Sequence, residues 1–266
     1  MEPFLKWAGG KRWLLSKQAV VFPEIINIDR YFEPFLGGGA VFFHLQPTNG
    51  CLSDVNQDLV NSYIIVRDKW ADLIEVLSKY NKQHNNEFYY RMRATKPRTP
   101  LQKAARFIYL NRTCWNGLYR VNKRGEFNVP IGTKTKVLLD ADNFQGLSGL
   151  LNQMDIEACD FEITIDKANE GDFVFIDPPY TVKHNLNGFV KYNENIFSWE
   201  DQIRLKKCIS RAIERGVLVL LLNADHNSIR TLYKGVGKMV SLERPSVIAG
   251  NSAARGIYSE LAIKSF

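Results

Sequence analysis

Cysteine is scarce in this sequence of 266 residues, and none of its four cysteines stands in a CxxC pair or near a group of histidines. The sequence therefore predicts no metal site and no disulfide framework. Long apolar runs are also lacking, because the longest aliphatic run, Val217 to Leu222, is too short to cross a bilayer. The first residues contain Lys6 and Gly9-Gly10 where a signal peptide would need an apolar core. We therefore expect a soluble protein of a reducing cytoplasm with no membrane partner.

Acidic residues are outnumbered in this chain. It has 28 Asp and Glu against 35 Lys and Arg, a formal net charge of +7. The imbalance is concentrated between Arg91 and Lys136, where twelve basic residues stand with a single acid, Glu126. Charge alone fits a phosphate-binding face and an ordinary solvated surface equally well. The hydrophobic content of 45% is enough for a substantial core, so we expect one large domain or a domain with a sizeable insertion.

Apolar patterns divide the chain into an α/β part and a helical middle. Short apolar runs predict buried strands at Tyr31 to Phe35, near Cys51 and Leu52, and at Phe173 to Ile176, Val217 to Leu222 and Ile257 to Ile263. Helical periodicity predicts helices over Asp58 to Tyr80, over Leu101 to Leu110, and from a capping box at Ser198 and Asp201 to Gly216. The sequence thus predicts one domain of residues 1–56 and 161–266, with residues 57–160 inserted as a mainly helical domain.

Two glycine-rich segments stand near the start of the chain. In residues 4–11, FLKWAGGK, the paired glycines allow close backbone approach to a ligand, although a turn before a helix would look the same. Residues 32–43 run from a strand into Gly37-Gly38-Gly39 and then a helix, which is where doubly wound folds bind nucleotides. The spacing is not GxGxxG and no basic residue follows, so an uncharged adenosyl ligand fits better than a dinucleotide.

Two acidic positions come directly after predicted strands. Asp54 is placed to accept hydrogen bonds from ribose hydroxyls, and it would equally suit a surface position or a helix cap. The motif Asp177-Pro-Pro-Tyr180 follows the strand Phe173 to Ile176, at the end of a strand where ligands gather. Its consecutive prolines stiffen the turn and leave backbone carbonyls free to accept hydrogen bonds. This motif is the strongest candidate for a catalytic site.

Six segments stand in an order typical of one enzyme family. They are Lys6 to Lys11, Glu33 to Phe35 with the glycines that follow, Ser53 to Asn56, Asn111 to Pro130, Asp160-Phe161 and Asp177 to Tyr180. Together they resemble the Dam family of DNA adenine-N6 methyltransferases over nearly the whole chain. The resemblance implies a Rossmann-like class I methyltransferase sheet, an α/β fold. It also implies an inserted, mainly helical target-recognition domain with a β-hairpin, whose turn is expected at Asn122 to Gly125.

The resemblance also implies roles for individual residues. The cofactor is S-adenosylmethionine, and its expected contacts are Trp7, Lys11, Phe35, Gly37, Gly39, Asp54, Phe161 and Asp177. The expected substrate is an adenine flipped out of the duplex. Asp177 and the Pro178 carbonyl accept its two amine hydrogens, while the Tyr180 ring stacks on the base. We expect direct methyl transfer, because no cysteine lies in a motif of the kind that cytosine-C5 enzymes use for covalent attack.

The implied partner is double-stranded DNA. We expect a monomer on DNA, one or more copies per duplex, in a bacterial or phage-infected cell. Its expected contacts are Lys6, Arg112, Trp115, Asn116, Leu118, Tyr119, Arg120, Asn122, Lys123, Arg124 and Pro130. Trp115 or Asn116 would fill the gap left by the flipped base or contact its neighbours. Family members that act on GATC have the residue types of Lys6, Leu118 and Arg120 at those positions, so GATC is the expected target. Trp115 and residues 121–124 depart from the family's usual forms.

Other interpretations share many of these residues. An enzyme of the same fold could methylate cytosine N4, RNA or a glutamine amide, but the DPPY motif and the motif order favour adenine. A DNA-binding regulator could keep the fold without catalysis, yet Asp177 and Lys11 are intact. A nucleotide-dependent oxidoreductase is opposed by the missing dinucleotide fingerprint. The sequence does not distinguish a partner of a restriction nuclease from a solitary or phage methylase.

Overall fold

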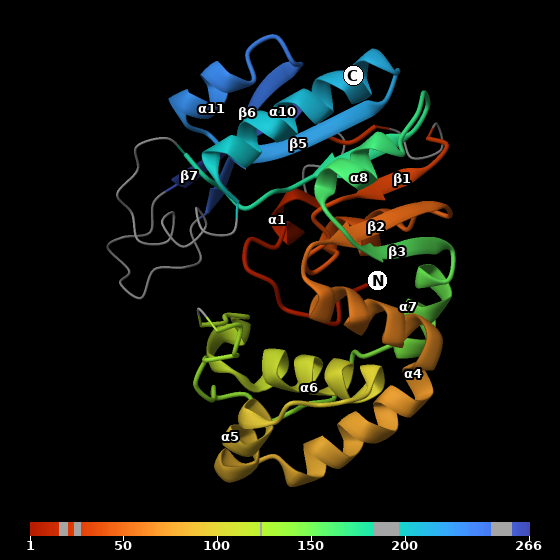
Figure 1. Cartoon of the computed structure of the whole chain (residues 1–266), viewed down its shortest axis with the longest axis vertical. Helices are drawn as coiled ribbons and strands as arrows, with labels where there is room; N and C mark the ends of the chain where they lie inside the picture. Colours follow the sequence, from red (N-terminus) through yellow and green to blue (C-terminus); the bar gives the residue numbers. More distant parts are fainter. Residues whose placement is uncertain (16–20, 24–27, 123, 183–196, 246–256) are drawn as a thin grey trace. The chain divides into compact units, whose positions relative to one another are not determined.

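The computed structural model describes residues 1–15, 21–23, 28–122, 124–182, 197–245 and 257–266, and its contacts separate two compact units (Figure 1). The first unit comprises Met1–Arg12, Leu36–Thr48 and Asp54–Ala158, and the second comprises Trp13–Phe35, Asn49–Ser53 and Cys159–Phe266. The first unit therefore contains nearly all of the expected insertion. It also contains Met1–Arg12 and Leu36–Thr48, which the sequence pattern assigns to the other domain.

A mixed sheet organises the second unit. Its strands are β1 (Tyr31–Glu33), β2 (Gly50–Asp54), β4 (Phe173–Ile176), β5 (Leu218–Ala224), β6 (Lys238–Pro245) and β7 (Ile257–Lys264), with Asp54 itself counted in the first unit. These six strands are neighbours in the order β2-β1-β4-β5-β7-β6. The pairs β1–β2, β1–β4 and β4–β5 are parallel, whereas β7 is antiparallel to both β5 and β6. This α/β arrangement agrees with the expected methyltransferase fold.

The predicted strands are confirmed, most closely at β4. All four residues of β4 are buried, so an uninterrupted apolar run identifies the strand. The ends of β1, β2, β5 and β7 fall within two residues of the predicted ones. Strand β6 was not predicted, because it is an edge strand whose side chains are mostly exposed or half-buried. Strand β3 (Met154–Ala158), in the first unit, was also not predicted, because its apolar residues alternate with acids and form no continuous apolar run.

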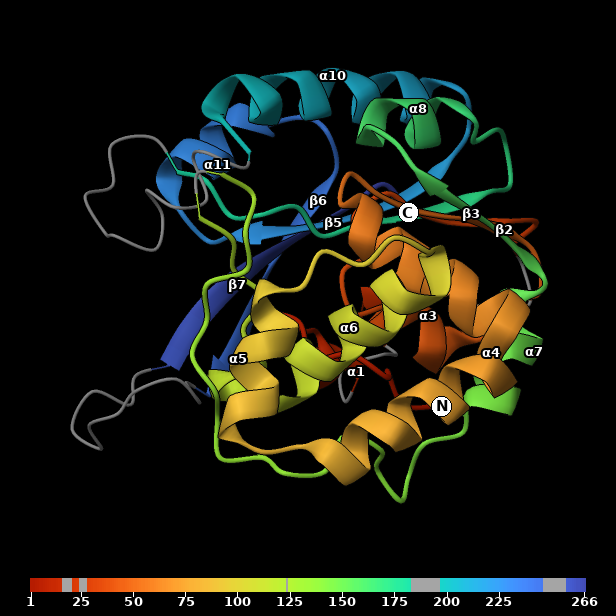
Figure 2. The ribbon, with the colours of Figure 1, turned by 60° about the horizontal axis from the view of Figure 1, so that its bottom comes forward.

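Helices α8 (Phe161–Asp166) and α10 (Trp199–Glu214) cover one face of this sheet (Figure 2), and α11 (Asn227–Leu232) follows β5. The predicted capping box of α10 is confirmed: the Asp201 N–H donates to Ser198 Oγ, and the Ser198 N–H donates to Asp201 Oδ2. The helix ends before Gly216, whose φ of +83° suits glycine. Its inner face packs Leu205 and Ile209 into the core above the sheet.

The first unit is mainly helical. Its elements include α3 (Ala40–Leu45), α4 (Gln57–Gln83), α5 (Asn86–Ala94), α6 (Pro100–Thr113), the 3₁₀ helix η2 (Trp115–Gly117) and α7 (Phe144–Leu151), and α1 (Arg12–Leu15) begins at its boundary. Helices α4 and α6 pack along one another (Figure 2). Both predicted helices are confirmed and extend up to three residues beyond their expected ends. Side chains of Asn56, Asn85 and Thr99 cap α4, α5 and α6.

Aromatic packing explains why the chain start joins the first unit. The Phe4 ring lies 4.9 Å from that of Tyr63 on α4 and 6.4 Å from that of Phe43 on α3. Phe43 also stacks on Tyr63 at 6.2 Å. Contacts of this kind bury large apolar areas and so hold the three segments together.

Among the described residues, the structure offers no helix that is both long and apolar enough to cross a membrane.

Candidate functional site

The predicted cofactor and catalytic residues follow the carboxyl ends of adjacent strands. Because β2, β1 and β4 are parallel neighbours, these ends lie at one edge of the sheet. Phe35 and the glycine loop follow β1, Asp54 ends β2, and Asp177 directly follows β4. In open α/β sheets, ligands bind at this edge. Within the second unit, Phe35 and Asp177 therefore follow adjacent parallel strands at the edge where such folds bind ligands.

The glycine loop is tied to the carboxylate of Asp54. Asp54 Oδ2 accepts a hydrogen bond from the Gly37 N–H at 3.1 Å, and Oδ1 accepts one from the Asn56 N–H at 2.9 Å. The Tyr63 hydroxyl donates to the Gly37 carbonyl at 3.1 Å. Burial raises the pKa of Asp54, while the two N–H donors oppose the rise. The loop and the acid therefore form one fixed arrangement in the first unit.

Trp7 lies directly against this loop. A Cβ built on Gly37 would be 2.6 Å from Trp7 Cδ1, and Gly37 has a φ of +47°. Only glycine fits both constraints without strain. The Trp7 ring also stacks on Tyr119 at 5.5 Å and on Phe107 at 6.3 Å. The structure thus brings a predicted cofactor residue, Trp7, against a predicted DNA contact, Tyr119.

Lys11 is buried in the first unit and donates from Nζ to the Gly9 carbonyl at 2.8 Å. Gly39 has a φ of +64°, and a Cβ there would lie 2.9 Å from the Tyr63 hydroxyl. The loop around Gly39 is therefore closely packed by neighbouring side chains. The predicted approach of this backbone to a ligand stays a prediction.

Aromatic rings gather in the second unit around Phe161. Phe35 stacks on Phe161 at 5.4 Å, and Phe197 contacts both rings at 5.6 and 5.7 Å. The Arg204 guanidinium lies 4.1 Å from the centre of the Phe161 ring and pairs with Asp160 at 2.6 Å. This cation–π contact fixes one face of the ring. The two predicted cofactor residues Phe35 and Phe161 are therefore neighbours.

The DPPY motif turns away from β4 with Pro178 buried and its other residues half-buried. The Tyr180 hydroxyl donates to Glu260 Oε2 at 2.7 Å. Glu260 lies on β7 and is only 3% exposed. A buried carboxylate needs hydrogen-bonding partners, and Tyr180 is one of them. Sequence reasoning missed Glu260, although a single acid within the apolar strand Ile257 to Ile263 was a visible signal.

The predicted DNA contacts are mostly exposed, and all belong to the first unit. Lys6, Trp115, Asn116, Arg120, Arg124 and Pro130 are exposed, while Leu118, Tyr119 and Asn122 are half-buried. Trp115 is the clearest outlier, because 53% of this large aromatic residue is exposed. An exposed aromatic residue among cations is more typical of a nucleic-acid-binding surface than of an ordinary protein surface.

The segment around Asn122 forms a tight turn. Asn122 Oδ1 accepts hydrogen bonds from the Arg124 and Glu126 N–H groups, and an isolated antiparallel bridge joins Val121 to Phe127. Gly125 has a φ of +74°. The expected turn chemistry is thus present at Asn122 to Gly125, with an isolated bridge where the sequence predicted a hairpin. Lys123 lies outside the described residues.

Arg112 does not fit the predicted role of a DNA contact. Its side chain is 4% exposed and pairs with Asp142 through two bonds of 2.6 and 2.7 Å. The same guanidinium donates to the carbonyls of Phe4 and Val137. Burial and five hydrogen bonds leave this group committed to the interior of the first unit. We therefore remove Arg112 from the expected DNA contacts.

All four cysteines are free thiols, and two of them have a raised pKa. Burial raises the pKa of Cys114 and of Cys208 to about 11. Both thiols are therefore protonated near neutral pH, which disfavours them as nucleophiles. The described residues contain no group of three His, Cys, Asp or Glu that could hold a metal ion.

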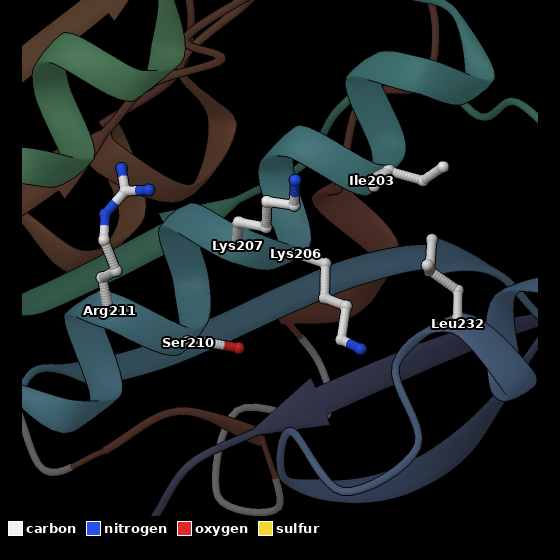
Figure 3. A pocket seen from close by; sticks show the side chains of 6 residues that line it. All are labelled: Ile203, Lys206, Lys207, Ser210, Arg211 and Leu232. Atoms are coloured by element: carbon white, nitrogen blue, oxygen red, sulfur yellow. The ribbon is translucent and has the colours of Figure 1, made fainter.

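A surface pocket on α10 and α11 contains none of the predicted residues (Figure 3). It is lined by Ile203, Lys206, Lys207, Ser210, Arg211 and Leu232. Its cations favour an anion, but Arg211 is already paired with Glu162 and Asp166 at 2.8 and 3.0 Å. We therefore assign no part of the expected site to this pocket.

Comparison with known proteins identifies the family. Residues 7–247 match the model of the D12 class N6 adenine-specific DNA methyltransferases. The whole chain is 35% identical to the type II methyltransferase M1.LlaDCHI of Lactococcus lactis subsp. cremoris, covering 96% of that protein. It is 37% identical to M.MjaIII of Methanocaldococcus jannaschii, covering 99% of it. The DNA adenine methylase of Serratia marcescens is 33% identical, over 97% of this chain and 96% of the relative.

The chain belongs to the D12 class family of N6 adenine-specific DNA methyltransferases. Its activity is therefore that of an adenine-specific DNA methyltransferase, as the sequence predicted.

The role assigned to Arg112 predicts a large loss of stability on substitution. Arg112→Ala should lower the free energy of unfolding by about 3–5 kcal/mol, because it removes a buried guanidinium and leaves half-buried Asp142 and the carbonyls of Phe4 and Val137 without this partner. Lys136→Ala is the matched control, since the exposed pair Lys136–Asp140 contributes little. Urea unfolding of both variants measures the difference. Equal stabilities of the two variants would contradict the assignment.

Proposed function

We propose that this enzyme transfers a methyl group from S-adenosylmethionine to N6 of an adenine flipped out of duplex DNA. The main support is the sheet topology, in which the glycine loop, Asp54 and the DPPY motif follow three adjacent parallel strands. The names of the Serratia marcescens and Escherichia coli relatives, both DNA adenine methylases, support the same reaction.

The residues present fit an adenosyl cofactor. Asp54 is held by the N–H groups of Gly37 and Asn56 and has the acceptor chemistry that ribose hydroxyls need. Gly37 and Gly39 lack the side chains that would fill the loop, and Trp7, Phe35 and Phe161 provide aromatic faces. Acidic and aromatic surroundings also suit a cationic sulfonium. When bound, S-adenosylmethionine supplies a methyl group made electrophilic by its positive sulfur.

The DPPY motif would act on the amine of the target base. The Asp177 carboxylate and the Pro178 carbonyl accept the two amine hydrogens, which draws the nitrogen lone pair out of conjugation with the ring. The two prolines keep these acceptors in a fixed relation. Tyr180 offers its ring to the base, while its hydroxyl is held by Glu260. Extruding the base costs roughly a few kcal/mol, which stacking on Tyr180 offsets in part.

Transfer is direct in this proposal. The amine is the nucleophile, so no side chain has to form a bond to the base. The raised pKa values of Cys114 and Cys208, both about 11, support this mechanism. A protonated, buried thiol is a poor nucleophile.

DNA binding is assigned to the exposed residues of the first unit. Arg124 and other exposed cations would contact phosphates, while Lys6, Leu118 and Arg120 would read bases in a GATC site. The Arg120 Nε–H donates to Asn128 Oδ1 at 2.9 Å, which holds the guanidinium in one orientation. Trp115 or Asn116 would occupy the space left by the flipped adenine, with one enzyme molecule acting at each site as a monomer.

A substitution in the glycine loop should weaken cofactor binding specifically. Gly37→Ala places a Cβ 2.6 Å from Trp7 and adds the strain of a positive φ, so it should bind S-adenosylmethionine at least about tenfold more weakly. Gly235→Ala is the control, because its φ is +83° and no atom lies within 4 Å of the added Cβ. Titration calorimetry on both variants measures the effect. If Gly235→Ala lost affinity for S-adenosylmethionine to the same extent, the loss would reflect lower stability of the protein, and the assignment of Gly37 to cofactor binding would fail.

Removing the catalytic acid should stop transfer without stopping DNA binding. We expect Asp177→Ala to lower turnover about 100-fold or more, because one acceptor for the amine hydrogens is lost. DNA affinity should change little, since the proposed phosphate contacts lie in other segments. Asp225→Asn is the control: Asp225 also follows a parallel strand, β5, but its carboxylate is bound by Arg230 and Ser259. Unchanged turnover of Asp177→Ala would refute its role.

Mapping the modified bases tests the proposal as a whole. Incubating the enzyme with S-adenosylmethionine and unmethylated genomic DNA should produce N6-methyladenine within GATC, detected by sequencing the product. Arg120→Ala should broaden the set of methylated sequences more than it weakens overall binding, because it removes a base contact. Methylation of cytosine N4 would overturn the proposed substrate, and a different adenine site would overturn the proposed specificity alone.

A further inference from the structure

A buried amide connects the backbone of Lys6 to the loop that carries Trp115. Asn111, on α6, is completely buried. Its Oδ1 accepts a hydrogen bond from the Lys6 N–H at 2.9 Å, and its Nδ2 donates to the Lys6 carbonyl at 2.8 Å. Nδ2 also lies 3.4 Å from the Gly117 carbonyl, which accepts a longer hydrogen bond. This pairing fixes both the position and the direction of the Lys6 backbone.

The Lys6 side chain is held from the other side by Gly117. Gly117 has a φ of +65°, and a Cβ built there would lie 2.6 Å from Lys6 Cδ and 2.9 Å from Lys6 Cβ. The aliphatic stem of Lys6 therefore packs against the bare backbone of Gly117, while Lys6 as a whole is exposed. Glycine at this position gives the lysine stem a defined path.

The same loop is anchored at its start. The Trp115 N–H donates to the Pro130 carbonyl at 2.9 Å, and the Leu118 N–H donates back to the Trp115 carbonyl at 3.2 Å. Asn116 and Gly117 are consecutive residues with positive φ, of 55° and 65°, a conformation that glycine and asparagine adopt more readily than other residues. Asn111 thus contacts a hydrogen-bonded loop on one side and the backbone of Lys6 on the other.

We propose that Asn111 is a positioning residue for sequence discrimination. This inference rests on the proposed function, in which Lys6 reads a base. A lysine has a long flexible stem, so it discriminates between bases only if its stem is directed before the DNA arrives. Asn111 and Gly117 supply that direction, and they fix Lys6 in register with Trp115 and Leu118. Asn111 acts through Lys6 and does not itself contact the DNA.

Discrimination between closely related duplexes tests this role. The full-length enzyme is assayed for kcat/KM on the mapped site and on duplexes with one base pair changed. Asn111→Leu removes all three hydrogen bonds and keeps the branching of the side chain. Asn111→Asp keeps an acceptor for the Lys6 N–H but loses the donor. Thr113→Val is the matched control, because Thr113 is also completely buried near the end of α6 and its hydroxyl donates to the Tyr109 carbonyl within the same helix.

Asn111→Leu should reduce discrimination about tenfold at the same base pair that Lys6→Ala affects. The double variant should lose no more than Lys6→Ala alone, since both changes remove one function. Thr113→Val should leave discrimination unchanged. If Asn111→Leu lowers activity equally on all duplexes, or adds to the effect of Lys6→Ala, the positioning role is wrong while the proposed function stands. If Lys6→Ala leaves discrimination unchanged, the proposed reading by Lys6 fails, and positioning by Asn111 fails with it.

A measurement without substrate separates positioning from general destabilisation. Hydrogen exchange of the Lys6 amide should be faster in Asn111→Leu than in Thr113→Val, because only the first variant removes the acceptor of that N–H. Asn111→Asp, which retains an acceptor, should fall between the two. Equal exchange in all three variants would overturn the proposed clamp even if Asn111→Leu were inactive.

Discussion

Parallel pairing of β1 with both β2 and β4 is the constraint on which the proposed site depends. The pairing aligns Tyr31 with both Gly50 and Phe173, so the three strands run in the same direction from the same level. Their carboxyl ends then reach one edge of the sheet whatever the intervening chain does. The long helical segment between β2 and β4 therefore leaves the pairing of these strands with β1 intact.

Within the first unit, one aromatic ring serves two predicted functions. Trp7 covers the bare backbone of Gly37 on the cofactor loop and stacks on Tyr119 in the predicted DNA-binding segment. Asn111 binds the residue before it, Lys6, through both backbone groups. Packed interiors transmit displacements because side chains have little free volume. The short N-terminal segment therefore has two independent supports, a ring against glycine and an amide against backbone.

Sequence reasoning succeeded where local chemistry decides the structure. The buried run of β4 and the capping box of α10 were identified because each needs only neighbouring residues. Strand β6 was missed because an edge strand carries polar side chains, and Glu260 was missed because its partner Tyr180 is 80 residues away. The assignment of Met1–Arg12 to the first unit also depends on distant contacts. These features arise from tertiary packing that no single segment encodes.

The basic segment shows how composition can point to the right partner and still misassign residues. Arg112 binds Asp142 and two carbonyls, and Arg106 donates to the carbonyls of Met92 and Arg93 at 2.7 and 2.6 Å. Arg106 thus binds carbonyls in the last turn of α5, and Arg112 binds carbonyls of non-helical segments, which is a structural use of arginine. The cations accessible to DNA are the exposed ones, such as Arg120 and Arg124. The basic residues of this segment therefore divide into buried ones that hold the fold and exposed ones that are proposed to bind DNA. Their burial, and not their spacing in the sequence, distinguishes the two groups.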